Sequence, residues 1–210
     1  MNKWNFVRYF GESKLVRSNY LWIFIIPLLA KNFDIISTHI GLDLELTFSL
    51  SKFFFASLFF CLGTVIYQLR CPSIIKQNES YASFLNEGKN TQHVSDYLVE
   101  SKKSFLSDVK EGDISTFKSK FDNCEGNDNK FDLKIEEEWF FVDKDRASCF
   151  FWDVYNFLNE SYRVSCFLSL SSYLIGVLFL MISSIVNVAF AFQYFFPNIK
   201  VFKVVYSIIS

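Results

Sequence analysis

Three charged residues of this 210-residue chain lie within or next to its first two apolar stretches. Charged side chains at such positions could line an ion path or form a buried ion pair. Lys31 and Asp34 follow the first apolar stretch, and Lys52 lies near the start of the second. If the two stretches form an antiparallel hairpin that turns near Asp43, Asp34 and Lys52 are each nine residues from the turn and lie at one depth. An unpaired charge within a bilayer costs about 2.5–3.5 kcal/mol on insertion scales, so we expect these two residues to pair.

Lys31, Asp34 and Lys52 are called the intramembrane charge cluster below. Lys31 competes with Lys52 for the carboxylate, because it lies three residues before Asp34 on the same helix face. The functional interpretation of the cluster is the lining of a pore, a permeation path or an oligomer interface. The structural interpretation is a clamp, and we favour it because both lysines lie close enough to the outer surface for their stems to reach water.

A second group of polar residues lies in the last apolar stretch of the chain. Ser183, Ser184 and Asn187 interrupt a run of large aliphatic and aromatic residues. Small and polar residues within a membrane helix tend to face other helices, because lipid offers them no partner. The three residues therefore form a candidate helix-packing face.

Motifs for catalysis, cofactor binding and metal binding are absent from the sequence. It contains no glycine-rich nucleotide loop, no GxSxG nucleophile motif and no HExxH zinc motif. The polar stretch 122–130 does not have the ligand spacing of a calcium loop. We expect a protein that is not an enzyme and holds no cofactor or metal. The cysteines form no CxxC pair and are expected to be reduced and structural; they are Cys61, Cys71, Cys124, Cys149 and Cys166.

The composition is that of a membrane protein with a soluble part. Hydrophobic residues make up 51% of the chain and aromatic residues 20%, and they are gathered in blocks instead of being spread at amphipathic spacing. The formal net charge of −1 provides no overall field that would attract nucleic acid. We therefore expect a lipid bilayer, and not DNA or RNA, as the main partner.

Three apolar segments are expected to be membrane helices, because a bilayer core of about 30 Å needs about 20 helical residues. The stretch 164–196 contains no charged residue, and 48–69 contains only Lys52 near one end. The first segment, 20–40, is less regular because it includes two charges and Pro27, which favours a kink. A re-entrant or interfacial helix is the alternative for this segment.

The distribution of basic residues predicts the topology. Four Lys or Arg residues precede the first segment, none lies in the short connection 41–47, and thirteen lie within 70–163. The positive-inside rule then places the N-terminus and a helical domain, 70–163, in the cytoplasm. The abundance of Lys, Asn, Ile and Phe is typical of an AT-rich bacterial genome, so we expect the spans in a bacterial inner membrane. Residues 1–18 are expected to lie along the cytoplasmic membrane surface as a basic, aromatic segment. The apolar tail 197–210 is expected on the outer side.

Within the cytoplasmic domain, two helices are predicted from hydrophobic spacing. Apolar residues recur at intervals of three and four over 91–110, which indicates an amphipathic helix with Gly112 as its C-cap. A shorter helix is predicted before it, around Tyr81, Phe84 and Leu85, and Gly88 is expected to end it.

Two further predictions concern the segments that lead into the third span. Residues 131–143 fit both the alternation of a strand and a helical face, and we favour the helix. From 146 to 163 the apolar spacing continues towards the third span without Gly or Pro, so we predict a single long helix from the cytoplasm into the membrane.

The sequence thus predicts an all-α integral membrane protein with an N-terminal two-helix transmembrane hairpin (19–69), a cytoplasmic helical domain and a long third transmembrane helix. This layout, and no motif, resembles the small membrane effectors of bacterial defence systems. It implies a non-enzymatic effector whose cytoplasmic domain receives a partner or ligand and whose spans self-associate and perturb the membrane. The alternative is an accessory or scaffolding subunit that binds another membrane protein within a larger transport or secretion complex.

Overall fold

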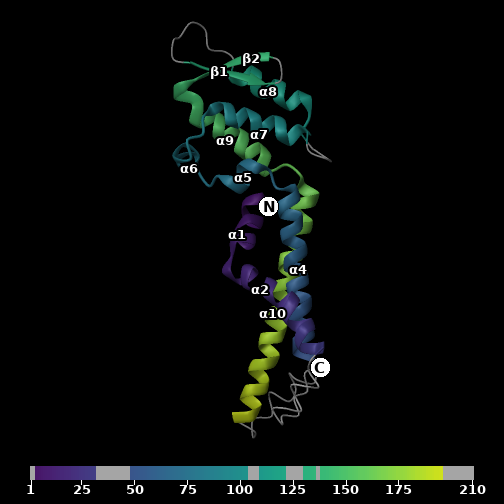
Figure 1. Ribbon diagram of the computed structural model, residues 1–210. Coiled ribbons are helices and arrows are strands. Elements are labelled where there is room, and N and C mark those ends of the chain that lie inside the picture. Colours follow the sequence, from purple (N-terminus) through teal and green to yellow (C-terminus); the bar gives the residue numbers. More distant parts are fainter. Residues whose placement is uncertain (1–2, 32–47, 104–108, 122–129, 136–137, 196–210) are drawn as a thin grey trace. The chain divides into compact units, whose positions relative to one another are not determined.

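The computed structural model describes residues 3–31, 48–103, 109–121, 130–135 and 138–195 (Figure 1). The fold is mostly helical, as expected, with one β-hairpin. The helices are α1 (Trp4–Glu12), α2 (Lys14–Lys31), α4 (Phe48–Arg70), α5 (Ser73–Gln77), α6 (Tyr81–Asn86), α7 (Thr91–Lys103), α8 (Glu111–Phe121), α9 (Ala147–Asn159) and α10 (Arg163–Phe195). The strands are β1 (Lys130–Ile135) and β2 (Glu138–Asp143), and a short 3-10 helix, η1 (Lys144–Arg146), follows them.

The chain divides into two compact units. Unit 1 comprises Met1–Arg8 and Tyr67–Phe167, and unit 2 comprises Tyr9–Ile66 and Leu168–Ser210. Three helices, α1, α4 and α10, contribute residues to both units. Unit 1 therefore includes all of the predicted cytoplasmic domain, 70–163, together with the first residues of the chain.

The core of unit 1 is built around α9, which contacts α5, α6, α7 and β2. Its apolar residues recur at three and four, so that one face is buried. Aromatic rings fill much of this core: Phe84 and Phe151 lie 5.1 Å apart between ring centroids, and Phe121 meets Phe150 edge-on at 5.1 Å. The residues of α9 that have less than 4% exposure are Ala147, Phe150, Phe151, Val154, Tyr155, Leu158 and Asn159.

Gly88 follows α6, as predicted. Its φ is 72°, in the left-handed region that favours glycine, and its backbone N–H donates to the Leu85 carbonyl at 2.9 Å.

The predicted C-cap at Gly112 is wrong. The helix expected over 91–110 is described as α7 only to Lys103, and Gly112 lies in the first turn of the next helix, α8. Acidic residues at positions 111 and 113 favour a helix start there, because they complement the positive end of the helix dipole.

We favoured a helix for 131–143, but the described part of this segment forms strands: 131–135 belong to β1 and 138–143 are β2. The strands pair antiparallel with Lys130 opposite Asp143 and Ile135 opposite Glu138. Apolar and charged residues alternate along β1, and aromatic and β-branched residues are concentrated in β2, so both strands have the composition that sheets favour. The helical spacing in this segment was the weaker signal.

The single helix predicted from 146 into the third apolar segment is broken at Glu160–Tyr162. Helix α9 ends at Asn159 and α10 begins at Arg163. Tyr162 has φ 53°, a backbone conformation that few non-glycine residues adopt. Its hydroxyl donates to the Ser101 carbonyl at 2.6 Å, and the Arg70 guanidinium lies 5.4 Å from its ring centroid. Contacts of this side chain outweigh the local preference for a continuous helix.

Helix α1 is packed against unit 1 through its first residues. Trp4 and Val7 have no exposed surface, and the Trp4 indole N–H donates to the Ser161 carbonyl at 2.9 Å. The backbone N–H of Asn5 donates to Asn159 Oδ1 at 3.1 Å. Phe6 and Tyr9 of the same helix are 46% and 78% exposed, and the expected membrane-surface position of segment 1–18 stays a prediction.

Arg8 fixes the same helix to α5. Its guanidinium donates to the carbonyls of Ile75 at 2.9 Å and Asn78 at 3.0 Å, and it forms an ion pair with Glu79. Carbonyl groups at a helix C-terminus have no partner within the helix and carry partial negative charge, so a guanidinium is a suitable donor there. Arg8 and Trp4 together hold α1 at two places on unit 1.

We expect Trp4→Phe to lower the unfolding free energy by about 1–3 kcal/mol, because the buried Ser161 carbonyl loses its donor while most of the ring packing remains. Thermal or denaturant unfolding of the purified chain in detergent measures this change. Tyr9→Phe is the matched control, since the Tyr9 side chain is 78% exposed and should be neutral. Equal stability of Trp4→Phe and the wild type would contradict the role assigned to the indole N–H.

Candidate functional site

In the part of the chain that the structure describes, two helices are long and apolar enough to cross a membrane. The segments are Ser51–Arg70, with mean hydropathy 1.5, and Arg163–Ala189, with mean hydropathy 2.1. Only 28% of each segment is buried inside the protein, whereas the core helix of a soluble protein would be mostly buried. Among the described residues, α2 does not meet this criterion. It begins at Lys14, earlier than the predicted start at 20, and the rest of the predicted segment, 32–40, lies outside the described residues.

Within unit 2, α4 and α10 approach closely at two glycines. A Cβ atom at Gly63 would lie 3.1 Å from the Tyr173 ring and 3.2 Å from the Ser169 carbonyl oxygen. A Cβ atom at Gly176 would lie 2.7 Å from the Phe60 ring. Glycine at these positions allows the two backbones to approach, as small residues do between membrane helices.

A chain of hydroxyl groups joins α2, α4 and α10 in unit 2. Thr64 Oγ1 lies 2.9 Å from the Tyr173 hydroxyl, and it is also hydrogen-bonded to the Tyr20 hydroxyl. Outside this chain, Ser169 Oγ of α10 donates a further hydrogen bond to the Gly63 carbonyl of α4 at 2.7 Å. In hydrocarbon such groups need internal partners, and interhelical bonds of this kind contribute about 0.6–1.7 kcal/mol each.

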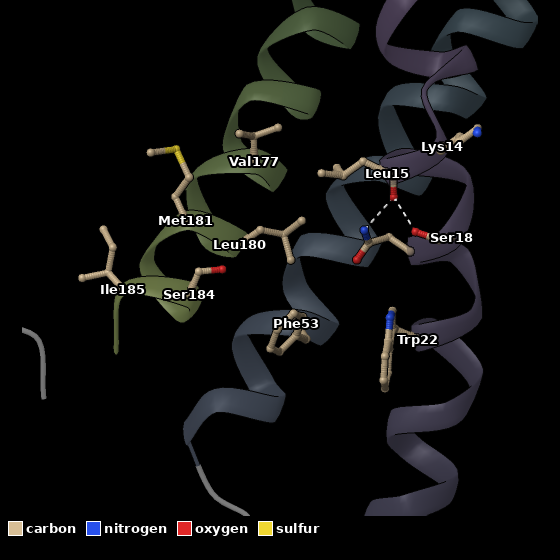
Figure 2. Close-up of a pocket in the computed structure, with 11 residues that line it drawn as sticks. Lys14, Leu15, Ser18, Trp22, Phe53, Val177, Leu180, Met181, Ser184 and Ile185 are labelled. Carbon is tan, nitrogen blue, oxygen red and sulfur yellow. Dashed lines mark hydrogen bonds between the residues drawn. The ribbon is translucent and has the colours of Figure 1, made fainter. Parts of the chain in front are cut away.

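An open groove of about 730 Å³ lies between α2, α4 and α10 (Figure 2). The part of its lining that α2 provides is largely polar, with Lys14, Ser18 and Asn19. The part that α10 provides is largely apolar; it comprises Val177, Leu180, Met181, Ser184 and Ile185. Trp22 and Phe53 lie towards one end, with ring centroids 6.1 Å apart. The groove is thus amphipathic along its length.

Hydrogen bonds hold the polar wall of the groove. Asn19 Nδ2 donates to the Leu15 carbonyl at 2.7 Å, and Ser18 Oγ donates to the same carbonyl at 3.1 Å (Figure 2). Asn19 is only 6% exposed, whereas Leu15 is 49% exposed. No acidic residue is among the eleven that line the groove, so its charged group is the ammonium of Lys14.

The residues predicted from sequence are only partly brought together. Lys31 is exposed and Lys52 is 9% exposed, while Asp34 lies outside the described residues, so the predicted pairing stays a prediction. In the predicted packing face, Ser183 is fully buried but Ser184 and Asn187 are exposed, and Ser184 lines the groove. The three residues do not all point into the protein.

Sequence reasoning missed the hydroxyl chain and the two glycine contacts. Thr64 lies in the middle of an otherwise apolar stretch, and Gly63 and Gly176 are small residues within long apolar runs. Both features are signals for helix packing in membranes. Which helix each residue contacts depends on the mutual rotation of the helices, and the hydrophobic pattern does not provide this information.

The cysteines differ in their access to solvent. Cys71 and Cys166 are buried, Cys61 is half-buried and Cys149 is exposed, and all four are free thiols. Burial raises the pKa of the Cys71 thiol well above its ordinary value. Because the thiolate is the reactive form, Cys71 is chemically protected both by access and by protonation.

We expect maleimide at pH 7.5 to label Cys149 rapidly and Cys71 only after denaturation, because Cys71 is 4% exposed and its burial favours the neutral thiol. Mass spectrometry of a labelling time course on variants that retain one of the two cysteines measures this difference. If the two thiols react at the same rate in the folded chain, the described packing at Cys71 is wrong.

We expect Gly176→Ala to destabilise the chain by about 1–3 kcal/mol, because the added methyl group overlaps the fully buried Phe60 ring. The matched control is Gly112→Ala in α8, where a Cβ atom meets nothing within 4 Å. There alanine should be neutral or stabilise by up to about 1 kcal/mol through its higher helix propensity. Thermal unfolding of both variants in one detergent makes the comparison, and a Gly176→Ala chain as stable as the wild type would contradict the close helix contact.

Within the described residues, no group of three or more His, Cys, Asp or Glu side chains could hold a metal ion. Comparisons with protein-family models, with curated proteins and with solved structures find no match for this chain.

Proposed function

We propose that the chain is an integral membrane protein whose helices α4 and α10 cross a bilayer, with unit 1 on the cytoplasmic side. The observation that carries the proposal is the amount of apolar surface that the protein leaves uncovered on these helices. Soluble proteins rarely expose contiguous apolar patches of this kind, and lipid is the solvent that suits them. The large apolar residues of α4 and α10 that are more than half exposed are Leu69, Val164, Phe167, Leu168, Leu174, Leu178, Met181 and Val188.

The third membrane segment of this proposal begins with α2. Leu21, Phe24 and Leu28 are each more than 60% exposed, and the helix is joined to α4 and α10 by the hydroxyl chain described above. Basic residues support the orientation, since thirteen lie within 70–163 and none within 41–47. The bacterial inner membrane is the location that fits this arrangement.

The biological role that we propose is that of a non-enzymatic membrane effector. Unit 1 would receive a partner or ligand, and the spans would self-associate and perturb the bilayer. The start of α10 supports this role, because its first turn lies in unit 1 and follows a backbone break held by contacts from other elements. Tyr162 is bonded to Ser101 of α7, and Ser161 to Trp4 of α1. A change in α7 or α1 on ligand binding would act on the first turn of a helix that continues into the membrane.

We expect the full chain to remain in the membrane fraction after alkaline carbonate treatment and to need detergent for extraction, because its apolar helices are exposed.

On induced expression, a membrane-potential dye should report depolarisation. Asp34→Ala and Lys52→Ala, which remove members of the intramembrane charge cluster, should abolish it at unchanged expression. Lys103→Ala is the matched control, since this exposed lysine at the end of α7 is outside the cluster and should leave depolarisation unchanged.

Two outcomes contradict the proposal at different levels. A chain that stays soluble after lysis without detergent overturns membrane insertion itself. An inserted chain that causes no depolarisation, and that co-purifies with a stoichiometric membrane protein, overturns the effector role and supports the accessory subunit.

A further inference from the structure

We propose that unit 1 has a binding surface for a short basic helix of a partner protein, and that residues 3–8 cover this surface as an internal competitor. The proposal rests on the proposed function, in which unit 1 receives a partner, and it names the place and the chemistry of that partner. Residues 3–8 are called the N-terminal segment below. The contacts of this segment carry the proposal.

The N-terminal segment is bound to unit 1 as a separate piece of chain. The rest of this unit, Tyr67–Phe167, is continuous in sequence, whereas Tyr9–Ile66 belong to unit 2. The segment therefore has no direct covalent connection to the residues that it contacts. A surface that binds such a segment through its side chains can bind the same side chains on another polypeptide.

One face of the N-terminal segment makes the buried contacts. Trp4 and Val7 have no exposed surface, and the Arg8 side chain is only 12% exposed. Their spacing of three and four residues is the one by which an amphipathic helix is recognised on a protein surface. Phe6 and Tyr9, by contrast, are 46% and 78% exposed. The segment is thus bound through one stripe of side chains, as a helical ligand is.

The part of unit 1 that binds the segment is called the docking surface. It lies at the ends of α5 and α9, and its main polar contacts with the segment come from Ile75, Asn78, Glu79, Asn159, Glu160 and Ser161.

The docking surface contains the tetrapeptide Asn-Glu-Ser-Tyr twice, at 78–81 and at 159–162. The first follows α5 and the second begins at the last residue of α9, so both lie where a helix ends. Each has a backbone carbonyl that accepts a hydrogen bond from the segment, at 3.0 Å from the Arg8 guanidinium in the first and at 2.9 Å from the Trp4 indole in the second. The segment therefore joins two helix ends that are far apart in sequence.

The charge of the docking surface selects a basic partner. Glu79 pairs with Arg8 at 2.9 Å, and Glu160 pairs with Lys3 at 3.2 Å. The two carboxylate side chains are 72% and 51% exposed, so both can be approached from solvent. Complementary charges of this kind favour some partners and exclude others. A helix that fits carries two basic residues five positions apart, with a tryptophan and a β-branched apolar residue between them.

We expect the N-terminal segment to open more readily than the core of unit 1. It lies near the end of the chain, only two of its six residues are buried, and both of its ion pairs are partly exposed. Segments with few buried contacts open locally at a lower free energy than a packed core. Because a partner helix binds only where the segment has opened, the affinity for the partner is reduced in proportion to the open fraction.

The test uses the full chain purified in mild non-ionic detergent, with a synthetic peptide of residues 1–12 that carries a fluorophore at its C-terminus. Fluorescence anisotropy measures binding of the peptide. Arg8→Ala in the chain weakens the internal competitor and leaves the docking surface unchanged, so we expect it to raise the affinity for the peptide about tenfold. The same substitution in the peptide should lower the affinity about tenfold, because the ligand then loses these contacts.

A milder variant and two controls accompany this comparison. Lys3→Ala in the chain removes only a half-exposed ion pair with Glu160 and should raise the affinity by less than Arg8→Ala does. Lys14→Ala in the chain removes an exposed basic residue outside the segment and should leave the affinity unchanged. A peptide with Tyr9→Ala should bind like the unchanged peptide, since this side chain is mostly exposed.

Four results would overturn the docking surface. The first is no binding of the peptide to the wild type, Arg8→Ala or Lys3→Ala. The second is equal affinity of the wild type and Arg8→Ala, since the segment would then not compete. The third is loss of cooperative unfolding in Arg8→Ala, which would make the segment an integral part of the fold of unit 1. The fourth is a wild-type dimer that Arg8→Ala dissociates, which would assign the surface to a second copy of the chain.

These outcomes are separate from those of the proposed function. Carbonate extraction and depolarisation are measured without the peptide. Membrane insertion and the effector role can therefore stand when the docking surface fails.

Discussion

Apolar surface that the protein itself does not cover is the constraint on which this molecule depends. Only 28% of the two most apolar helical segments is buried, although unit 1 has a well-packed aromatic core of its own. Leaving a large apolar side chain in water instead of an apolar environment costs about 1.5–3 kcal/mol, so many such side chains would disfavour the folded state in water. In a bilayer the same surface carries no such cost. The proposed membrane insertion rests on this uncovered apolar surface.

The interior of unit 2 shows the other side of the same constraint. The hydroxyls of Tyr20, Thr64 and Tyr173 are hydrogen-bonded to one another, which is the arrangement that helices surrounded by lipid would need. Apolar side chains gain little from helix association in lipid, and close backbone approach at Gly63 and Gly176 provides van der Waals contact instead. The groove lies between the same three helices, on the polar side of α2. It is a place where three helices do not fill the space between them.

The sequence predicted the elements whose signals are local and strong. The apolar blocks of α4 and α10, the face of α7 and the glycine after α6 were all visible in composition or spacing. The break at Glu160–Tyr162 was not, because it depends on a hydrogen bond from Tyr162 to Ser101, 61 residues earlier, and on Trp4, 157 residues before Ser161. The strands β1 and β2 were harder to predict, because the apolar residues of this segment fit both the two-residue period of a strand and the 3.6-residue period of a helix. Of the candidate site residues, Ser184 lines the groove, while the predicted packing face and the predicted charge pairing stay predictions.

The break before α10 also changes how the first turn of α10 is connected to α9. If α9 and α10 formed one continuous helix, a rotation of α9 would be passed directly to α10, and the two could change their relative orientation only by bending of the helix. Here Tyr162 lies in the left-handed region and is held by contacts with α7 and with Arg70 of α4, while Trp4 of α1 covers the adjacent Ser161 carbonyl. Each of these contacts comes from a different element, so the conformation at the start of α10 is set jointly by all of them. Under the proposed function, this short segment is the place where a change in unit 1 would reach α10.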